Sequence, residues 1–195
     1  MPSRVHLIQL AGGKGQRAGA DGLPPKQFRP TGQGPLFLVS LKAFARISPD
    51  VGEIGSITIT VPEVWREAVA QALDQDPVLA GIPSQLAEAG ETRTRSTWHA
   101  LQALAQTGPQ ATDLVAIHDA ARPFADAALL ERLVVAAAEV GGAVPAVPVA
   151  DTVVQRDEGG RAIYLERDKL AGVQTPQVFR WDLLREAHSW ACLLY

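Results

Sequence analysis

The chain has 195 residues, 47% of them hydrophobic and 20% charged, and its formal net charge is −3. A chain of this size and composition can bury the core of one ordinary domain. The acidic balance argues against a general binder of nucleic acid or membrane surfaces, and no apolar stretch is long enough to span a bilayer. One cysteine, Cys192, leaves no internal disulfide, and the N-terminus lacks the apolar core of a signal peptide. We therefore expect a cytoplasmic protein that binds neither nucleic acid nor membrane.

Apolar runs alternate with helical patterns along most of the chain. Continuous or alternating apolar residues predict strands over residues 5–10, 57–61, 85–89, 114–118 and 143–149. Apolar residues spaced i, i+3 and i+4 predict helices over residues 35–47, from 62 onward, over 94–105, and after Asp126 as N-cap. This order predicts an α/β fold with a Rossmann-like, mostly parallel sheet and helices on both faces. Ligands bind such sheets at the carboxyl ends of the strands, near a topological switch point.

Residues 151–174 interrupt this alternation. Short β-like runs at 152–154 and 162–165 flank Asp157-Glu158-Gly159-Gly160, which is a favourable hairpin turn. A two-stranded hairpin alone is marginally stable in water, so we expect this protruding arm to lie on a partner subunit and form a homodimer. No linker separates a second domain, and residues 1–195 are expected to form a single domain.

A glycine-rich loop follows the first predicted strand, with the sequence Ala11-Gly12-Gly13-Lys14-Gly15-Gln16-Arg17. Its glycines lack Cβ atoms, so backbone N–H groups can approach one ligand closely. Residues 11–30 hold one acid, Asp21, and four cations: Lys14, Arg17, Lys26 and Arg29. Cations on a glycine loop suit a pyrophosphate or triphosphate. The loop matches neither the P-loop nor the dinucleotide fingerprint, and a glycine turn with solvated lysines is the alternative.

Two further turns follow predicted strands. In the turn that begins at His118, Asp119 could accept a hydrogen bond from a ribose or substrate hydroxyl, or simply pair with Arg122. In the turn Gly90-Glu91-Thr92-Arg93, the hydroxyl residues could cap a helix, or backbone groups and Ser96 could read a base edge. Because both turns end strands of the same predicted sheet, we expect them beside the glycine loop.

Six motifs occur in one order: Ala11-Gly12-Gly13-x-Gly15-x-Arg17, Pro25-Lys26-Gln27-Phe28, Gly90-Glu91-Thr92-Arg93-x-x-Ser96, His118-Asp119-Ala120-Ala121-Arg122-Pro123, Val147-Pro148-Val149-x-Asp151-Thr152 and Gln174-Thr175-Pro176-Gln177-Val178-Phe179. Together they resemble the 2-C-methyl-D-erythritol 4-phosphate cytidylyltransferases of the non-mevalonate isoprenoid pathway over nearly the whole chain. The resemblance implies a fold of the nucleotide-diphospho-sugar transferase type. It also implies transfer of a cytidylyl group from CTP to that polyol phosphate, with release of pyrophosphate.

The resemblance further implies roles for individual residues. Arg17 and Lys26 would be the catalytic cations on the CTP phosphates. The residues that would bind CTP are Ala11, Gly12, Gly13, Gly15, Gly90, Glu91, Ser96, Asp119, Ala120 and Arg122. The polyol phosphate would contact Thr175 together with Thr152 and Arg167, which would reach in from the arm of the neighbouring subunit. Mg²⁺ would bridge the phosphates and be held mainly by nucleotide oxygens, because the sequence lacks a clear carboxylate pair.

The chain departs from the family pattern in two places, and each leaves an alternative open. The loop reads Ala-Gly-Gly where the family more often has Ala-Ala-Gly, and Glu91 stands where Asp is more frequent. Ala-Gly-Gly is also found in ribitol-phosphate cytidylyltransferases, so ribitol 5-phosphate is an alternative substrate. The family continues with a strand, a helix and a phosphate-binding lysine beyond the position of Tyr195. On that basis the second alternative is a truncated, catalytically weak relative that binds nucleotide.

Overall fold

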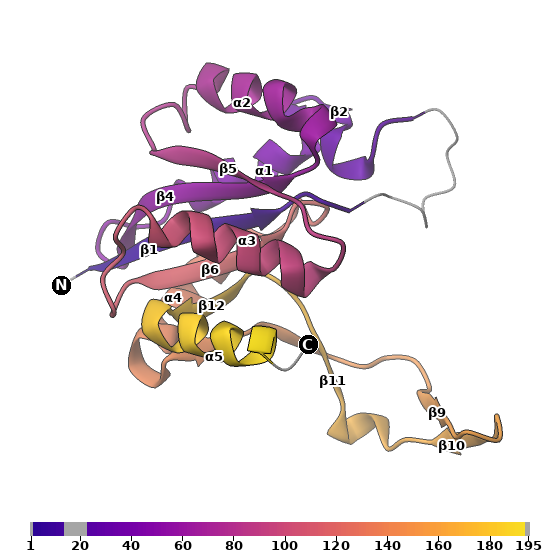
Figure 1. The fold of residues 1–195 in the computed structure, drawn as a ribbon. Coiled ribbons are helices and arrows are strands. Elements are labelled where there is room, and N and C mark those ends of the chain that lie inside the picture. Colours follow the sequence, from indigo (N-terminus) through magenta and orange to yellow (C-terminus); the bar gives the residue numbers. More distant parts are fainter. Residues whose placement is uncertain (1, 14–22, 194–195) are drawn as a thin grey trace.

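A six-stranded sheet forms the centre of the computed structural model, which describes residues 2–13 and 23–193 (Figure 1). In spatial order its strands are β5 (Ser84–Glu88), β4 (Gly52–Val61), β1 (Ser3–Leu10), β6 (Leu114–Asp119), β12 (Gln177–Arg180) and β7 (Gly142–Ala143). The first four of these run parallel, and β12 runs antiparallel to both of its neighbours. The predicted mostly parallel sheet is therefore confirmed.

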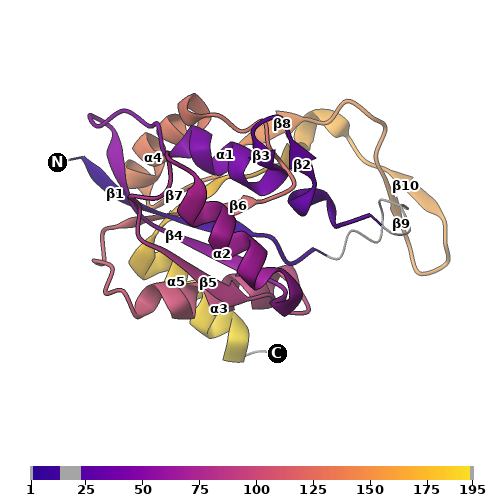
Figure 2. The ribbon, with the colours of Figure 1, turned by 90° about the horizontal axis from the view of Figure 1, so that it is seen from above.

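Helices cover both faces of this sheet, as the sequence predicts (Figures 1 and 2). One apolar core holds side chains of α1 (Leu36–Phe44), α2 (Arg66–Gln75) and α4 (Ala127–Val140). A second core, on the other face, holds side chains of α3 (Arg93–Ala105) and α5 (Trp181–Leu193). Strand β1 serves both cores, since Leu7 faces the first and Ile8 the second. Burial on both faces explains why apolar and polar residues do not alternate strictly along this strand.

Side-chain caps fix the starts of two helices that follow the sheet. Thr92 precedes α3 and its hydroxyl accepts a hydrogen bond from the N–H of Arg95 at 3.1 Å. Asp126 precedes α4 and accepts from the N–H of Leu129 at 2.8 Å, as the sequence predicts. Each cap satisfies an N–H group that the helix itself cannot pair. The turns before α3 and α4 consequently have defined ends.

The expected strand over residues 143–149 is wrong, because the structure divides it into two. Only β7 joins the central sheet, while β8 (Ala146–Pro148) pairs with β11 (Ala171–Val173) in a separate two-stranded ladder. Pro145 and Pro148 lack backbone N–H groups, and proline cannot continue the interior of a sheet. Strand β12 and helix α5 were not predicted at all.

The arm of residues 151–174 extends away from the body of the protein (Figure 1). It contains the predicted hairpin, formed by β9 (Val154–Arg156) and β10 (Ala162–Tyr164), although β9 begins two residues later than expected. Gly160 in its turn has a φ of 77°, a conformation that glycine adopts without strain. The 3₁₀ turn η4 (Arg167–Lys169) follows.

Four short elements complete the part of the chain that the structure describes: the 3₁₀ turns η2 (Lys26–Phe28) and η3 (Glu63–Trp65) and the paired strands β2 (Pro30–Thr31) and β3 (Gly34–Pro35). The turn η3 leads directly into α2, where the sequence predicts one continuous helix. Among the described helices, none combines the length and apolar character needed to cross a membrane.

Candidate functional site

The predicted CTP-binding segments meet at the carboxyl edge of the parallel sheet. From β1 the chain passes to β4 and β5 on one side and then to β6 on the other, so β1 and β6 flank the topological switch point. Backbone hydrogen bonds continue past the strand ends: the Ala11 N–H donates to the Thr60 carbonyl at 2.9 Å, and the Ala120 N–H donates to the Leu10 carbonyl at 3.0 Å. Ligands bind α/β sheets at this position.

The described part of the glycine loop ends at Gly13, so Gly15 and Arg17 lie outside the described residues. Gly12 packs tightly, because a Cβ built on it would lie 2.6 Å from the Cβ of Ala89. A Cβ built on Gly13 would meet nothing within 4 Å. Ala89 therefore leaves no room for a side chain at position 12, whereas position 13 has room for one.

Lys26 begins the 3₁₀ turn η2 (Lys26–Phe28) and is exposed. The next residue, Gln27, is buried, and its side-chain amide donates to the carbonyls of Ala11 at 2.7 Å and Gly13 at 2.8 Å. The turn that begins at Lys26 is thus joined through Gln27 to the described start of the glycine loop. The sequence analysis did not assign Gln27 a role, although it belongs to the quoted Pro-Lys-Gln-Phe motif.

The turn between β5 and α3 lies against the glycine loop. The Gly90 N–H donates to the Ser96 hydroxyl oxygen at 3.0 Å, and that hydroxyl is 3.3 Å from the Gly90 carbonyl. A Cβ built on Gly12 would lie 3.6 Å from the Ser96 hydroxyl oxygen. Glu91 is exposed at the same turn. The structure therefore brings together Gly12, Gly90, Glu91 and Ser96, which are four of the residues predicted to bind CTP, and Ser96 holds the turn in shape.

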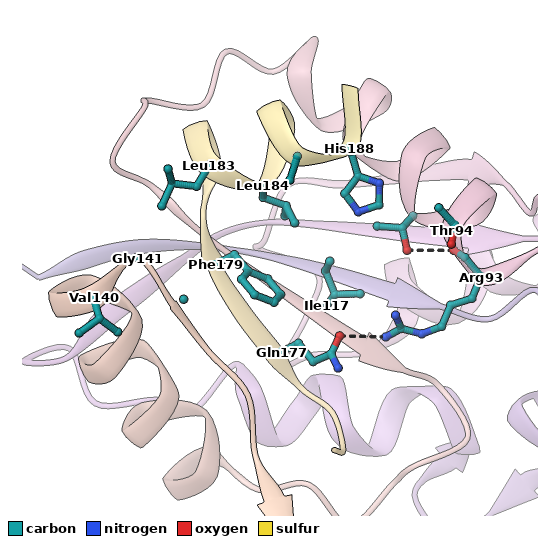
Figure 3. A pocket seen from close by; sticks show the side chains of 13 residues that line it. Arg93, Thr94, Ile117, Val140, Gly141, Gln177, Phe179, Leu183, Leu184 and His188 are labelled. Carbon is teal, nitrogen blue, oxygen red and sulfur yellow. Dashed lines mark hydrogen bonds between the residues drawn. The ribbon is translucent and has the colours of Figure 1, made fainter. Parts of the chain in front are cut away.

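Asp119 ends β6 and is held from two sides. Its two carboxylate oxygens each lie 3.3 Å from a guanidinium Nε, one from Arg93 and one from Arg122. Arg93 also donates to the side-chain oxygen of Gln177 at 3.3 Å (Figure 3). The ion pair with Arg122 is therefore present, and the Asp119 side chain is still 33% exposed. Exposed pairs contribute little to stability, so their main effect is to orient the carboxylate. Arg93 is a second residue that the sequence analysis left without a role.

Thr175 lies beneath this carboxylate in a buried chain of hydrogen bonds. The Asp119 N–H donates to the Thr175 hydroxyl oxygen at 3.2 Å, and that oxygen is 3.1 Å from His118 Nδ1. His118 Nε2 is 2.9 Å from the Arg122 carbonyl, which can only accept, so Nε2 carries the proton and Nδ1 accepts from Thr175. Every donor and acceptor in this chain of hydrogen bonds has a partner only while His118 is neutral. The structure thus joins Thr175 to the Asp119 turn.

Stability should fall in acid because of His118. Burial lowers its pKa from 6.5 to about 4, outweighing the hydrogen bond to the Arg122 carbonyl, which acts to raise it. Between these values the unfolded chain binds the proton and the folded protein does not. The contribution of His118 to the free energy of unfolding is therefore complete above about pH 6.5 and is lost as the pH falls toward 4. Between pH 7 and pH 5 the free energy of unfolding should fall by about 2 kcal/mol. Urea unfolding at both pH values should show a smaller pH dependence for His118→Gln, and an unchanged dependence would contradict this account.

Thr152 and Arg167 do not join the other predicted residues. Both are exposed on the arm, where an Arg167 guanidinium nitrogen donates to the Ala150 carbonyl at 3.3 Å. The arm projects away from the sheet edge that carries Asp119 (Figure 1). Their expected contact with substrate, across a subunit boundary, stays a prediction.

Metal-binding side chains do not cluster in the described part of the chain. No group of three His, Cys, Asp or Glu side chains there could hold a metal ion. The carboxylate of Asp119 already has a guanidinium beside each oxygen.

A cavity of about 570 Å³ lies between α3, α5 and β12, and Arg93 forms part of its wall (Figure 3). Its wall is largely apolar, with Phe179, Leu183 and Leu184, and His188 faces it from α5. It shares Arg93 with the Asp119 ion pairs, but its lining residues are not those that the sequence analysis predicts for CTP.

Known proteins resemble this chain over most of its length. A sequence model of the 2-C-methyl-D-erythritol 4-phosphate cytidylyltransferase family (IspD) matches residues 5–193. A bifunctional enzyme IspD/IspF of Rhodopseudomonas palustris strain BisA53 is 40% identical over 190 residues, covering 95% of this chain and 43% of its own. One of Solidesulfovibrio magneticus is 42% identical over 187 residues, covering 94% of this chain and 45% of its own. The chain therefore spans less than half the length of these curated relatives.

Solved structures agree with this assignment. The 2-C-methyl-D-erythritol 4-phosphate cytidylyltransferase of Thermus thermophilus has a TM-score of 0.62 and 30% identity, covering 98% of this chain and 76% of its own. A 4-diphosphocytidyl-2C-methyl-D-erythritol synthase has a TM-score of 0.71 and 25% identity, covering 95% of this chain and 79% of its own. With the match over residues 5–193, these likenesses place the chain in the 2-C-methyl-D-erythritol 4-phosphate cytidylyltransferase family.

Proposed function

We propose that this protein transfers a cytidylyl group from CTP to 2-C-methyl-D-erythritol 4-phosphate. The products would be 4-diphosphocytidyl-2-C-methyl-D-erythritol and pyrophosphate, and the reaction belongs to isoprenoid biosynthesis. Family membership supports the reaction class. The observation that carries the proposal is the glycine loop at the sheet switch point, joined through Gln27 to the Lys26 turn. We further propose that the chain works as one nucleotidyltransferase domain in the cytoplasm.

The proposed chemistry needs no covalent intermediate on the enzyme. A phosphate oxygen of the polyol phosphate attacks the α-phosphorus of CTP in line, and pyrophosphate leaves. Catalysis then consists of positioning two polyanions and stabilising the charge that develops on the α-phosphoryl oxygens. Lys26 and Arg17 are proposed to supply that charge. We propose that CTP arrives as its Mg²⁺ complex, in which the ion neutralises phosphate charge, because the described residues offer no ready ligand cluster.

Nucleotide recognition is proposed to use the two turns that meet the loop. The backbone around Ala11, Gly12 and Gly90, with the side chains of Glu91 and Ser96, would read the cytosine edge. The hydrogen bonds between Gly90 and Ser96 support this role, because they fix the backbone groups that a base edge would meet. Asp119, oriented by two guanidinium groups, would accept a hydroxyl hydrogen bond from ribose or from the polyol.

The deciding experiment measures pyrophosphate release from CTP and Mg²⁺ with each polyol phosphate. We expect release with 2-C-methyl-D-erythritol 4-phosphate and none with CTP alone. Faster release with D-ribitol 5-phosphate would transfer the proposal to that substrate. Binding of CTP without release from either compound would indicate the catalytically weak, nucleotide-binding alternative. Absence of both binding and release would reject the proposal.

We also propose that the arm of residues 151–174 forms a homodimer and carries Thr152 and Arg167 toward the partner's site. Its apolar side chains support this, since Ile163 is 49% and Tyr164 is 75% exposed. We expect light scattering to give the dimer mass at micromolar concentration, and the double variant Ile163→Asp/Tyr164→Asp to shift it toward the monomer. A monomeric wild-type protein at that concentration would contradict the proposal.

A further inference from the structure

The side chain of Gln27 occupies an unusual place between two predicted phosphate-binding segments. It is only 4% exposed, and its amide nitrogen lies 2.7 Å from the Ala11 carbonyl and 2.8 Å from the Gly13 carbonyl. A primary amide carries two hydrogens, so one nitrogen can donate to both carbonyls at once. Neither backbone carbonyl belongs to a regular strand or helix. The glutamine therefore closes the start of the glycine loop into a fixed shape.

This double contact also sets the direction of a backbone donor. In a trans peptide the carbonyl of one residue points opposite to the N–H of the next. The Ala11 carbonyl faces Gln27, so the N–H of Gly12 faces away from it. The Gly12 N–H is thus directed to the side of the loop opposite the glutamine. Backbone N–H groups held in this manner are the usual donors to phosphate or base oxygens.

The η2 turn, which carries Gln27, packs against the core. Phe28 follows Gln27 in the η2 turn and stacks on Trp65, with ring centroids 4.6 Å apart and planes 17° apart. Phe28 also meets Phe37 edge-on at 6.2 Å. The turn that carries Lys26 is consequently packed against α1 and the η3 turn. Through its two hydrogen bonds, Gln27 holds the start of the glycine loop against this turn.

We propose that Gln27 is a positioning residue for nucleotide binding: its side-chain amide holds the glycine loop against the Lys26 turn in the shape that receives CTP. The identity of the ligand, CTP, rests on the proposed function. The hold of Gln27 on the glycine loop, which we call the Gln27 clamp, rests on its two hydrogen bonds to Ala11 and Gly13. A glutamine that merely satisfied its own buried amide would have no specific effect on nucleotide affinity. The two roles therefore differ in what a substitution changes.

The test uses two variants and one control in the full chain. Gln27→Met keeps the length of the side chain and removes both donors, while Gln27→Glu keeps the shape and sets a carboxylate against two carbonyls. Gln33→Met makes the same change at an exposed glutamine. We expect KM for CTP to rise about 10-fold or more in Gln27→Met and further in Gln27→Glu, the scale of lost buried hydrogen bonds. KM for the polyol phosphate should stay within about 2-fold, and Gln33→Met should match the wild type.

Hydrogen exchange measured by mass spectrometry on the ligand-free protein separates this inference from the proposed function. Peptides covering residues 11–13 should exchange faster in Gln27→Met than in Gln33→Met, whatever reaction the wild type catalyses. If the wild type is inactive but this difference is present, the clamp stands and the proposed function fails. If exchange of these residues is unchanged, or if thermal stability falls while KM for CTP stays at the wild-type value, the positioning role is overturned.

Discussion

Replacing Lys26 by alanine should lower the turnover of CTP at least about 100-fold. The side chain is exposed at the start of a turn whose next residue is hydrogen-bonded to the glycine loop, so its ammonium can reach phosphate oxygens bound there. Removing one positioned charge from a site of developing negative charge costs about 10²-fold to 10³-fold in turnover. The loss should appear in kcat, because the contact strengthens as charge develops. Steady-state pyrophosphate release measures it directly.

A matched control separates this effect from a general loss of surface charge. Arg46 is an exposed cation just beyond α1, and Arg46→Ala should keep turnover within about 2-fold of wild type. Both variants should unfold at nearly the wild-type temperature, because exposed charges contribute little to stability. Turnover of Lys26→Ala within 10-fold of wild type would contradict the role proposed for this lysine.

The parts of the site that the sequence could predict are those fixed by chain topology. Each predicted turn follows a strand, and the carboxyl ends of parallel strands meet at one edge of a sheet. Knowledge of the strands was therefore enough to place Gly12, Gly90 and Asp119 together. Ion pairing of Asp119 with Arg122 could also be anticipated, because the two residues are three apart in one turn.

Contacts between segments far apart in the chain could not be predicted in the same way. Arg93 reaches Asp119 across 26 positions, and Thr175 reaches His118 across 57. No local pattern marks such pairs, since each partner is an ordinary polar residue of a turn or strand end. Strand β12 escaped prediction because it has four residues and too little alternation to stand out. The division of residues 143–149 into two strands could have been predicted, since the two prolines in this segment argue against one continuous strand.

Gly12→Ala should lower kcat/KM for CTP about 100-fold, and the structure supplies a way to rescue it. The added methyl group would lie 2.6 Å from the Cβ of Ala89, which is attached directly to the backbone and cannot turn aside. The loop must therefore shift, and a displacement of about 1 Å in a catalytic site can cost about 10²-fold. The overpacking should also destabilise the protein by about 1–3 kcal/mol. Gly13→Ala has open space and should leave the unfolding temperature unchanged.

The double variant Gly12→Ala/Ala89→Gly removes the clashing methyl group from the opposite side. It should regain most of the lost stability and kcat/KM, giving a large favourable coupling in a double-mutant cycle. This rescue bears on the choice of substrate. If the methyl group of Ala89 is what keeps position 12 a glycine, the Ala-Gly-Gly sequence reflects packing and gives no reason to favour ribitol 5-phosphate. Failure of the double variant to recover, or a change in its preferred polyol phosphate, would show that Gly12 contacts substrate more directly.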